Sequence, residues 1–129
     1  MADQAKELRM QAKIDEVKTE FNESIVALLA EINVQRLRGE GIVTPTPVIE
    51  RTNLRWTLAW KEKEKISFDL NVVVGIEDDG TQAKVGRVWV QRHASTALDY
   101  EDHTPTTRMR RLAMLSLKDI RDAIEQEMR

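Results

Sequence analysis

Hydrophobic residues recur every three or four positions over the first third of the chain, which is the spacing of one face of an α-helix. The stripe comprises Met10, Ile14, Val17, Phe21, Ile25, Leu28, Leu29 and Ile32. Gly39 and Gly41 follow it, and Arg36 and Arg38 precede the first glycine. Glycines after a basic last turn are typical of a helix C-terminus. The pattern predicts one long helix over residues 2–38.

The predicted helix is long for a small domain. Roughly 35 residues at 1.5 Å per residue give about 50 Å, whereas a small domain has a diameter of about 30 Å. We therefore expect the first two turns or so to project beyond the rest of the domain, or to pack on a second copy of the chain.

Two stretches after residue 51 alternate hydrophobic and polar positions, as strands with one buried face do. The hydrophobic positions are Leu54, Trp56, Leu58 and Trp60 in the first stretch, and Ile66, Phe68, Leu70, Val72, Val74 and Ile76 in the second. Asp79-Gly80 then predicts a hairpin turn, because glycine accepts the positive φ of such turns. Before these strands, Pro45 and Pro47 predict an extended connector over residues 39–51.

A third strand is expected at the end of segment 52–92, and its alternation is imperfect. Val88 and Val90 fall on one face and Trp89 on the other, while Val85 is out of phase. Gly86 is typical of a β-bulge that resets the register. Segment 52–92 is thus predicted to form a three-stranded antiparallel meander.

The face opposite Val88 and Val90 is a candidate partner-binding surface. It is predicted to carry Arg55, Arg87 and Trp89 among polar residues, and tryptophan and arginine are favoured anchors at protein interfaces. The alternative is that Trp89 faces the core, or that the projecting helix or a second copy covers it.

An amphipathic helix is predicted over residues 105–128, after an acidic loop over residues 93–104. Thr104 suits the N-cap and Pro105 the first helical position. The apolar arc comprises Met109, Leu112, Ala113, Leu117, Ile120, Ala123, Ile124 and Met128. The prediction completes an α+β fold of helix, three-stranded antiparallel meander and helix, in a single domain over residues 1–129.

Cations in this predicted helix form a candidate anion-binding or nucleic-acid-binding site. They are Arg108, Arg110, Arg111, Lys118 and Arg121. Arginines in a first turn oppose the helix dipole, so a negative charge should offset them. Phosphate is one such partner. The alternative is local ion pairing with Asp99, Glu101 and Asp102.

Composition narrows the classes of function. The 129 residues include 20 basic and 22 acidic side chains, a net charge of -2, which gives no overall attraction to nucleic acid or to an anionic membrane. The absence of cysteine excludes disulfides, thiol catalysis and cysteine-ligated metals. The N-terminus lacks the apolar core of a signal peptide, and no stretch has the length of a membrane span. We expect a cytoplasmic protein with no membrane partner.

Catalytic motifs are absent. The chain lacks a glycine-rich phosphate loop, a nucleophile elbow and a paired metal motif, and we expect neither a cofactor nor a metal. His93 and His103 are the two histidines. Together with the acidic loop they are the basis of the less favoured alternative, a small enzyme.

Two known families resemble this chain. The stretches "IVALLAEINVQRLRGEG", "LRW", "ISFDLNVVV" and "AKVGRVWV" lie within residues 25–92 and resemble, in order, the bacterial trypsin-co-occurring domain 2. Members occur beside trypsin-like peptidases, so this resemblance implies a non-enzymatic accessory module in bacterial conflict or signalling systems. The predicted order of elements also resembles the double-stranded RNA-binding domain, which would place Arg108, Arg110 and Arg111 against phosphates.

These patterns predict a non-enzymatic protein–protein interaction or assembly module, and the first resemblance implies that it belongs to a bacterium or phage. We expect a homo-oligomer joined through the long helix or a sheet edge. The alternative is an RNA- or DNA-binding module that uses the arginines at the start of the C-terminal helix.

Overall fold

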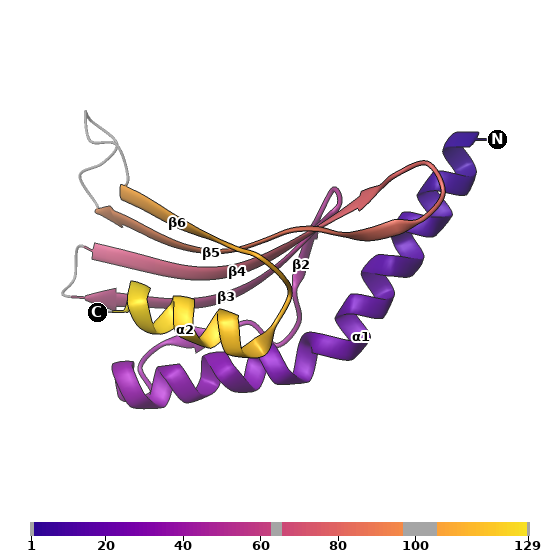
Figure 1. Ribbon diagram of the computed structural model, residues 1–129. Helices are drawn as coiled ribbons and strands as arrows, with labels where there is room; N and C mark the ends of the chain where they lie inside the picture. The colour runs from indigo at the N-terminus through magenta and orange to yellow at the C-terminus, as the bar shows by residue number, and fades with distance from the viewer. Residues whose placement is uncertain (1, 63–65, 97–105, 129) are drawn as a thin grey trace.

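The chain forms one antiparallel sheet with both helices on the same face (Figure 1). The computed structural model describes residues 2–62, 66–96 and 106–128. The elements are α1 (Ala2–Leu37), β1 (Ile42–Val43), β2 (Val48–Glu50), β3 (Asn53–Glu62), β4 (Ile66–Asp78), β5 (Ala83–Thr96), β6 (Thr106–Leu112) and α2 (Leu117–Glu127). The predicted α+β class is confirmed.

The sheet is larger than expected, because it has six strands instead of a three-stranded meander. Neighbouring strands follow the order β1-β3-β4-β5-β6, and β2 pairs with the other end of β3. Strands β3, β4 and β5 are the predicted meander and form the centre of the sheet. Strands β1, β2 and β6 extend it at the edges.

Strands β1 and β2 lie within the expected connector over residues 39–51. Between them, the Thr44 N–H donates to the Thr57 carbonyl at 3.0 Å, and Thr44 Oγ1 accepts from the Thr57 N–H at 3.1 Å. Pro45 and Pro47 follow Thr44 and lie outside both strands, where a missing N–H interrupts no ladder bond. The prolines therefore interrupt this edge of the sheet, but β1 and β2 still pair with β3 on either side of them.

The predicted helix over residues 105–128 is wrong in its first part, because residues 106–112 form β6. The helix α2 begins at Leu117, and its N-cap is Ser116, whose Oγ accepts from the Asp119 N–H at 3.4 Å. The expected cap Thr104 and the expected first helical residue Pro105 lie outside the described residues. Of the expected acidic loop over residues 93–104, residues 93–96 instead belong to β5, and the other residues lie outside the described part of the chain.

The core lies between one face of the sheet and the two helices. Strand residues Leu54, Trp56, Leu58, Leu70, Val72, Val74 and Val90 pack with helix residues Ile25, Leu29, Ile32, Ile120 and Ile124. Trp56 is fully buried, and its indole Nε1 donates to Asn22 Oδ1 of α1 at 2.9 Å. The alternation in β3 and β4 thus correctly identifies the buried face.

The end of the β4–β5 hairpin extends beyond β3 and lies beside the N-terminal half of α1 (Figure 1). Met10, Ile14 and Val17 are buried within the same chain. The side chains of residues 4–8 are exposed, as expected for a projecting end. The hydrophobic stripe of α1 therefore needs no second copy to cover it.

The register between β4 and β5 shifts at Gly86. Gly75 pairs with Arg87, whereas Ile76 pairs with Val85, so Gly86 is the extra residue of a β-bulge. The predicted bulge is confirmed. It returns Val85 to the helix-covered face, where this side chain packs against the core.

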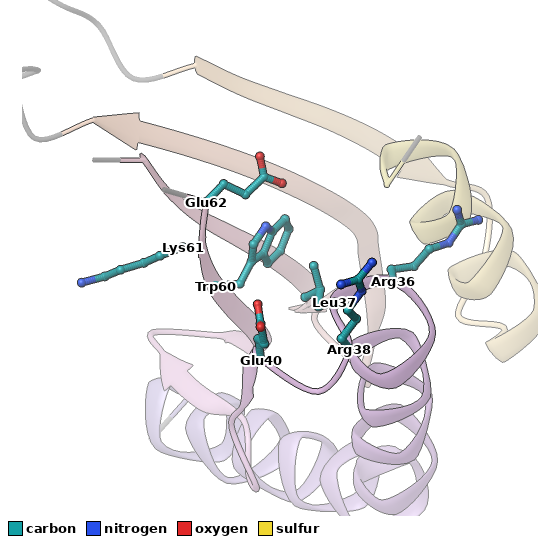
Figure 2. Close-up of a pocket in the computed structure, with 7 residues that line it drawn as sticks. All are labelled: Arg36, Leu37, Arg38, Glu40, Trp60, Lys61 and Glu62. Atoms are coloured by element: carbon teal, nitrogen blue, oxygen red, sulfur yellow. The ribbon is translucent and has the colours of Figure 1, made fainter. Parts of the chain in front are cut away.

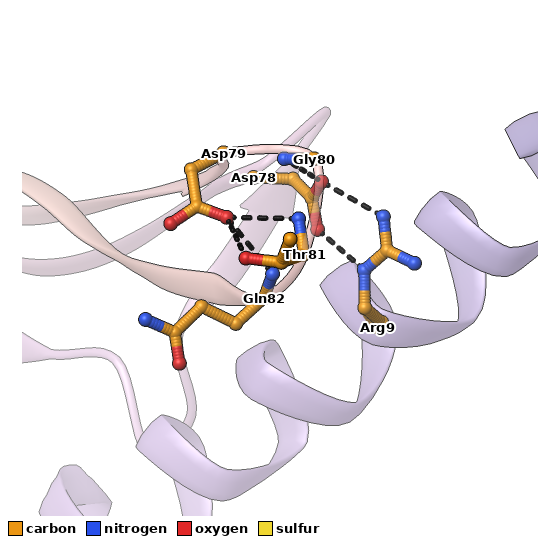
Figure 3. Close-up of polar contacts among 6 residues, drawn as sticks. All are labelled: Arg9, Asp78, Asp79, Gly80, Thr81 and Gln82. Atoms are coloured by element: carbon orange, nitrogen blue, oxygen red, sulfur yellow. Dashed lines mark hydrogen bonds and ion pairs between the residues drawn. The ribbon is translucent and has the colours of Figure 1, made fainter.

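The turn between β4 and β5 confirms the Asp79-Gly80 prediction. Gly80 has a φ of +100°, a conformation that favours glycine. Asp79 Oδ1 accepts hydrogen bonds from the N–H groups of Gln82 and Thr81, each at 2.9 Å (Figure 3). These N–H groups lower the pKa of Asp79, because they stabilise its ionised form.

An ion pair connects α1 to this turn. Arg9 donates from Nε and Nη2 to the two carboxylate oxygens of Asp78, at 2.8 and 2.9 Å (Figure 3). The Asp78 side chain is only 1% exposed. The hydrogen bonds from Arg9 hold the pKa of Asp78 below its ordinary value of 3.8, because the charged carboxylate is the stronger acceptor.

Acid should weaken this connection. Since the pKa of Asp78 is lower in the folded chain, the unfolded chain takes up the proton first, and stability is lost as the pH falls below about 4. We expect Arg9→Gln to lower the urea midpoint near pH 7 and to have a smaller effect at about pH 3. Lys13→Gln is the control, because Lys13 pairs with the exposed Glu16. Equal losses for Arg9→Gln at both pH values would contradict the prediction.

Candidate interaction surface

Both helices pack on one face of the sheet, and no described element covers the other (Figure 1). We call this second surface the open face. Its central side chains are Arg55 and Thr57 of β3, Asn71 and Val73 of β4, Arg87, Trp89 and Gln91 of β5, and Met109 and Arg111 of β6. Most of these side chains are polar or cationic, unlike those of the helix-covered face.

Trp89 lies in the middle of the open face, with Val73 on one side and Arg111 on the other. Val88 and Val90, its neighbours along β5, are 2% and 0% exposed, whereas Trp89 is partly exposed. The prediction that Trp89 points away from the core is confirmed. The alternative that α1 covers it is wrong, because α1 lies on the other side of the sheet (Figure 1).

Arg55 and Arg87 lie on the open face with Trp89. Arg55 is in the same cross-strand row, separated from Trp89 by Val73. Its Nη2 is 3.0 Å from Glu50 Oε1, so this carboxylate offsets part of its charge. Arg87 is exposed, and it has no ion pair within the described residues. The structure thus brings the three predicted partner-binding residues onto one surface.

Met109 and Arg111 also belong to this surface, although the sequence pattern predicted them to lie in a helix. Arg111 pairs with Trp89 in the register, and Met109 pairs with Gln91. Met109 is 61% exposed. A helix over residues 105–128 would have separated these side chains from Trp89, whereas a strand places them beside it. If "TRMRR" is taken as a strand, alternate side chains share a face, and this places Met109 and Arg111 on the same side.

The cations predicted to form an anion site are divided between the two faces of the sheet. Arg108 and Arg110 lie on the helix-covered side of β6, where they contact Glu127 Oε2 and Oε1 at 3.4 and 3.3 Å. Arg111 lies on the open face. The argument from a helix dipole does not apply to these arginines, because they belong to a strand. The acidic partners considered for them, Asp99, Glu101 and Asp102, lie outside the described residues.

The remaining two predicted cations lie on α2. Arg121 pairs with Glu31 of α1 at 2.7 Å, and its hydrogen bond lowers the pKa of Glu31. Lys118 is exposed. A second ion pair between the helices joins Arg36 to Glu125. Arg121 therefore contributes to helix packing, and the five cations of the predicted anion-binding site do not form one continuous surface.

Glu127 is a buried acidic residue that the sequence analysis missed. It is 4% exposed, and besides the two arginine contacts its carbonyl oxygen accepts from Arg92 Nη1 at 2.9 Å. Glu127 follows Ala123 by four positions and Ile124 by three, so it lies on the apolar arc of the helix. A carboxylate on such an arc is the sequence signal for a buried cationic partner.

Of the two histidines, the structure describes only His93. His93 is on β5, and its Nδ1 is 2.8 Å from Thr107 Oγ1 on β6. His103 lies outside the described residues. Within residues 2–62, 66–96 and 106–128, no group of three or more potential metal ligands is found.

A pocket of about 250 Å³ lies at the C-terminal end of α1 (Figure 2). It is lined by Arg36, Leu37, Arg38, Glu40, Trp60, Lys61 and Glu62. Arg36 is paired with Glu125, and the lining carries both signs of charge. The Trp60 indole N–H has no acceptor among the described residues, but this atom is buried and not open to the pocket. The pocket therefore does not favour a particular ligand.

Comparisons with protein-family models, curated proteins and solved structures find no match. The resemblance to the trypsin-co-occurring domain 2 and the topological resemblance to the double-stranded RNA-binding domain thus stay predictions. In the part of the chain that the structure describes, no helix is long and apolar enough to cross a membrane.

Proposed function

We propose that the chain is a non-enzymatic protein–protein interaction module whose contact surface is the open face. The observation that carries the proposal is the position of Trp89, partly exposed on a sheet face that no described helix covers. Tryptophan, methionine and arginine are enriched at protein interfaces. Trp89, Met109, Arg87 and Arg111 supply these residue types on one surface.

An acidic partner suits this surface better than a second copy of it. Arg87 and Arg111 are exposed and have no ion pair within the described residues. Two open faces stacked on each other would bring such cations together, whereas a partner that carries carboxylates would neutralise them. The charge pattern therefore favours a different protein as the partner.

Self-association and a bacterial or phage origin stay predictions from the sequence. One reason for self-association, a long helix without cover, is weakened because the chain buries Met10, Ile14 and Val17 itself. Light scattering at low and high salt would give the oligomeric state. A mass of one 14.9 kDa chain under both conditions would contradict the homo-oligomer prediction. It would not affect the proposed interaction with another protein.

The proposed contact can be tested by photo-crosslinking in cells of the source organism. A photoreactive amino acid at position 89 should crosslink to a partner, and Trp89→Ala should lower the affinity of the purified partner at least about tenfold. Position 118 is the control, because Lys118 is exposed on α2, away from the open face. No crosslink at position 89 above the level at position 118 would argue against the open face as the contact surface.

Nucleic-acid binding is the second candidate function, and one observation favours it. Trp89 lies beside Arg87 and Arg111 on an open sheet, and single-stranded nucleic acids stack on aromatic residues next to cations. We expect any such binding to give a salt-sensitive gel shift that Arg111→Glu abolishes. Absence of a shift with both RNA and DNA at low salt would rule this candidate out.

A further inference from the structure

We propose that the outer edge of β6, which pairs with no described strand other than β5, binds an extended acidic segment of the partner by β-strand addition. This inference rests on the proposed function, because it names the chemistry of the partner and the way in which the partner reaches the open face. In strand addition, a peptide pairs with the unpaired backbone groups of a sheet edge, and its alternate side chains provide specificity.

The two edges of the sheet differ in their capacity for pairing. One edge consists of β1 and β2, which have two and three residues and are separated by Pro45 and Pro47. Short strands and prolines protect an edge from further pairing. The other edge is β6, which has seven residues and no proline, and within the described residues it pairs only with β5. The edge that can accept another strand is thus β6.

The arginines of β6 make this edge selective for an acidic strand. Within the described residues, Arg108 and Arg110 share one carboxylate, that of Glu127, so the described part of the helix-covered side of the strand has more positive than negative charge here. Their side chains are 54% and 45% exposed. Cations on an edge oppose pairing with a second copy of the same strand, because like charges would lie opposite one another. Carboxylates on an incoming strand would instead be attracted.

The other side of β6 offers an apolar contact. Met109 is 61% exposed there, and the neighbouring Arg111 pairs with Trp89 in the register. Successive residues of an added strand point to opposite sides of the sheet. Acidic residues on one side would lie near Arg108 and Arg110, and apolar residues on the other side would lie near Met109. The expected binding motif therefore alternates acidic and apolar residues.

The test uses the full chain and a labelled synthetic peptide in which glutamate and valine alternate. We expect fluorescence anisotropy to show binding that weakens with salt, and hydrogen exchange to show slower exchange of β6 amides in the complex. Two control peptides distinguish the contribution of backbone pairing from that of charge. N-methylation at alternate residues keeps the charges but removes ladder donors, and lysine in place of glutamate reverses the charge. Neither control peptide should bind.

A matched pair of variants locates the contact. Arg108→Gln should weaken peptide binding about tenfold, because it removes a cation from the side of β6 that faces the acidic residues of the added strand. Lys118→Gln makes the same charge change on α2 and should have little effect. The proposal is overturned if the glutamate–valine peptide does not bind at low salt, if the N-methylated peptide binds equally well, or if both variants act alike. A crosslink at position 89 that persists in any of these cases would keep the open face as a contact surface and remove only strand addition.

Discussion

Replacing Trp56 with alanine should lower the free energy of unfolding by about 3–5 kcal/mol, the usual loss for a buried aromatic side chain. Trp56 is fully buried between the sheet and α1, so the substitution leaves a cavity that the neighbouring strands cannot close. It also removes the donor to Asn22 Oδ1, which leaves a partly buried acceptor without its partner. Urea denaturation followed by circular dichroism measures the loss.

Trp89→Ala is the control for this prediction, because it makes the same chemical change on the open face. Trp89 is partly exposed, so we expect a loss of about 1 kcal/mol or less. Equal losses at positions 56 and 89 would mean that Trp89 is as deeply packed as Trp56. The open face would then not be available to a partner.

Removal of residues 1–20 should abolish cooperative unfolding. The deletion takes Met10, Ile14 and Val17 out of the core, and burial of each such side chain contributes roughly 1.5–3 kcal/mol. The sum, roughly 5–9 kcal/mol, is comparable with the whole stability of a small domain, about 5–15 kcal/mol. Urea titration of the truncated chain would check this. A transition at the midpoint of the full chain would contradict the assigned role of α1.

Leu8→Glu is the matched control for the deletion. Leu8 is 67% exposed, so the substitution should change stability by only about 0.5 kcal/mol. A large loss would show that the projecting end of α1 is packed. The deletion itself is a poor test of self-association, because an unfolded chain changes its apparent mass for other reasons. Substitutions on the open face or on β6 are better suited.

Hydrophobic periodicity predicts the central elements correctly because each of them buries only one of its faces. The stripe of α1 and the alternation in β3 and β4 each correspond to a single buried face. The β4–β5 turn and the bulge at Gly86 are local features that depend on a few residues. For these elements the local preference and the tertiary packing agree, so the pattern alone is sufficient.

Edge strands are harder to predict because backbone pairing, not burial, determines them. In β1 and β2, Ile42, Val48 and Ile49 are 75%, 40% and 42% exposed, so no alternation marks the strands. In β6 the hydrophobic spacing fits a helix as well as a strand. The register with β5 places Arg108 and Arg110 near Glu127 of α2. Contacts between segments distant in sequence decide such a case, and a single sequence does not display them.

The candidate interaction surface was predictable to the same extent. Arg55, Arg87 and Trp89 lie on strands whose alternation is clear, and the structure places all three on the open face. Arg111 lies on the strand that was expected to be a helix, so it was assigned to a different site. Its neighbours Arg108 and Arg110 lie on the same strand, and the structure places them on the helix-covered side, where they contact Glu127.

The position of Glu127 has a consequence for the order of events during synthesis. Arg110 precedes Glu127 by 17 residues, and Arg92 precedes it by 35. A ribosome therefore releases β5 and β6 before the carboxylate that contacts the arginines of β6 and before the carbonyl oxygen that accepts from Arg92 of β5. Until α2 has formed, the arginines of β6 lack their contacts with Glu127. An acidic chaperone or partner that binds β6 at this stage would compete with α2.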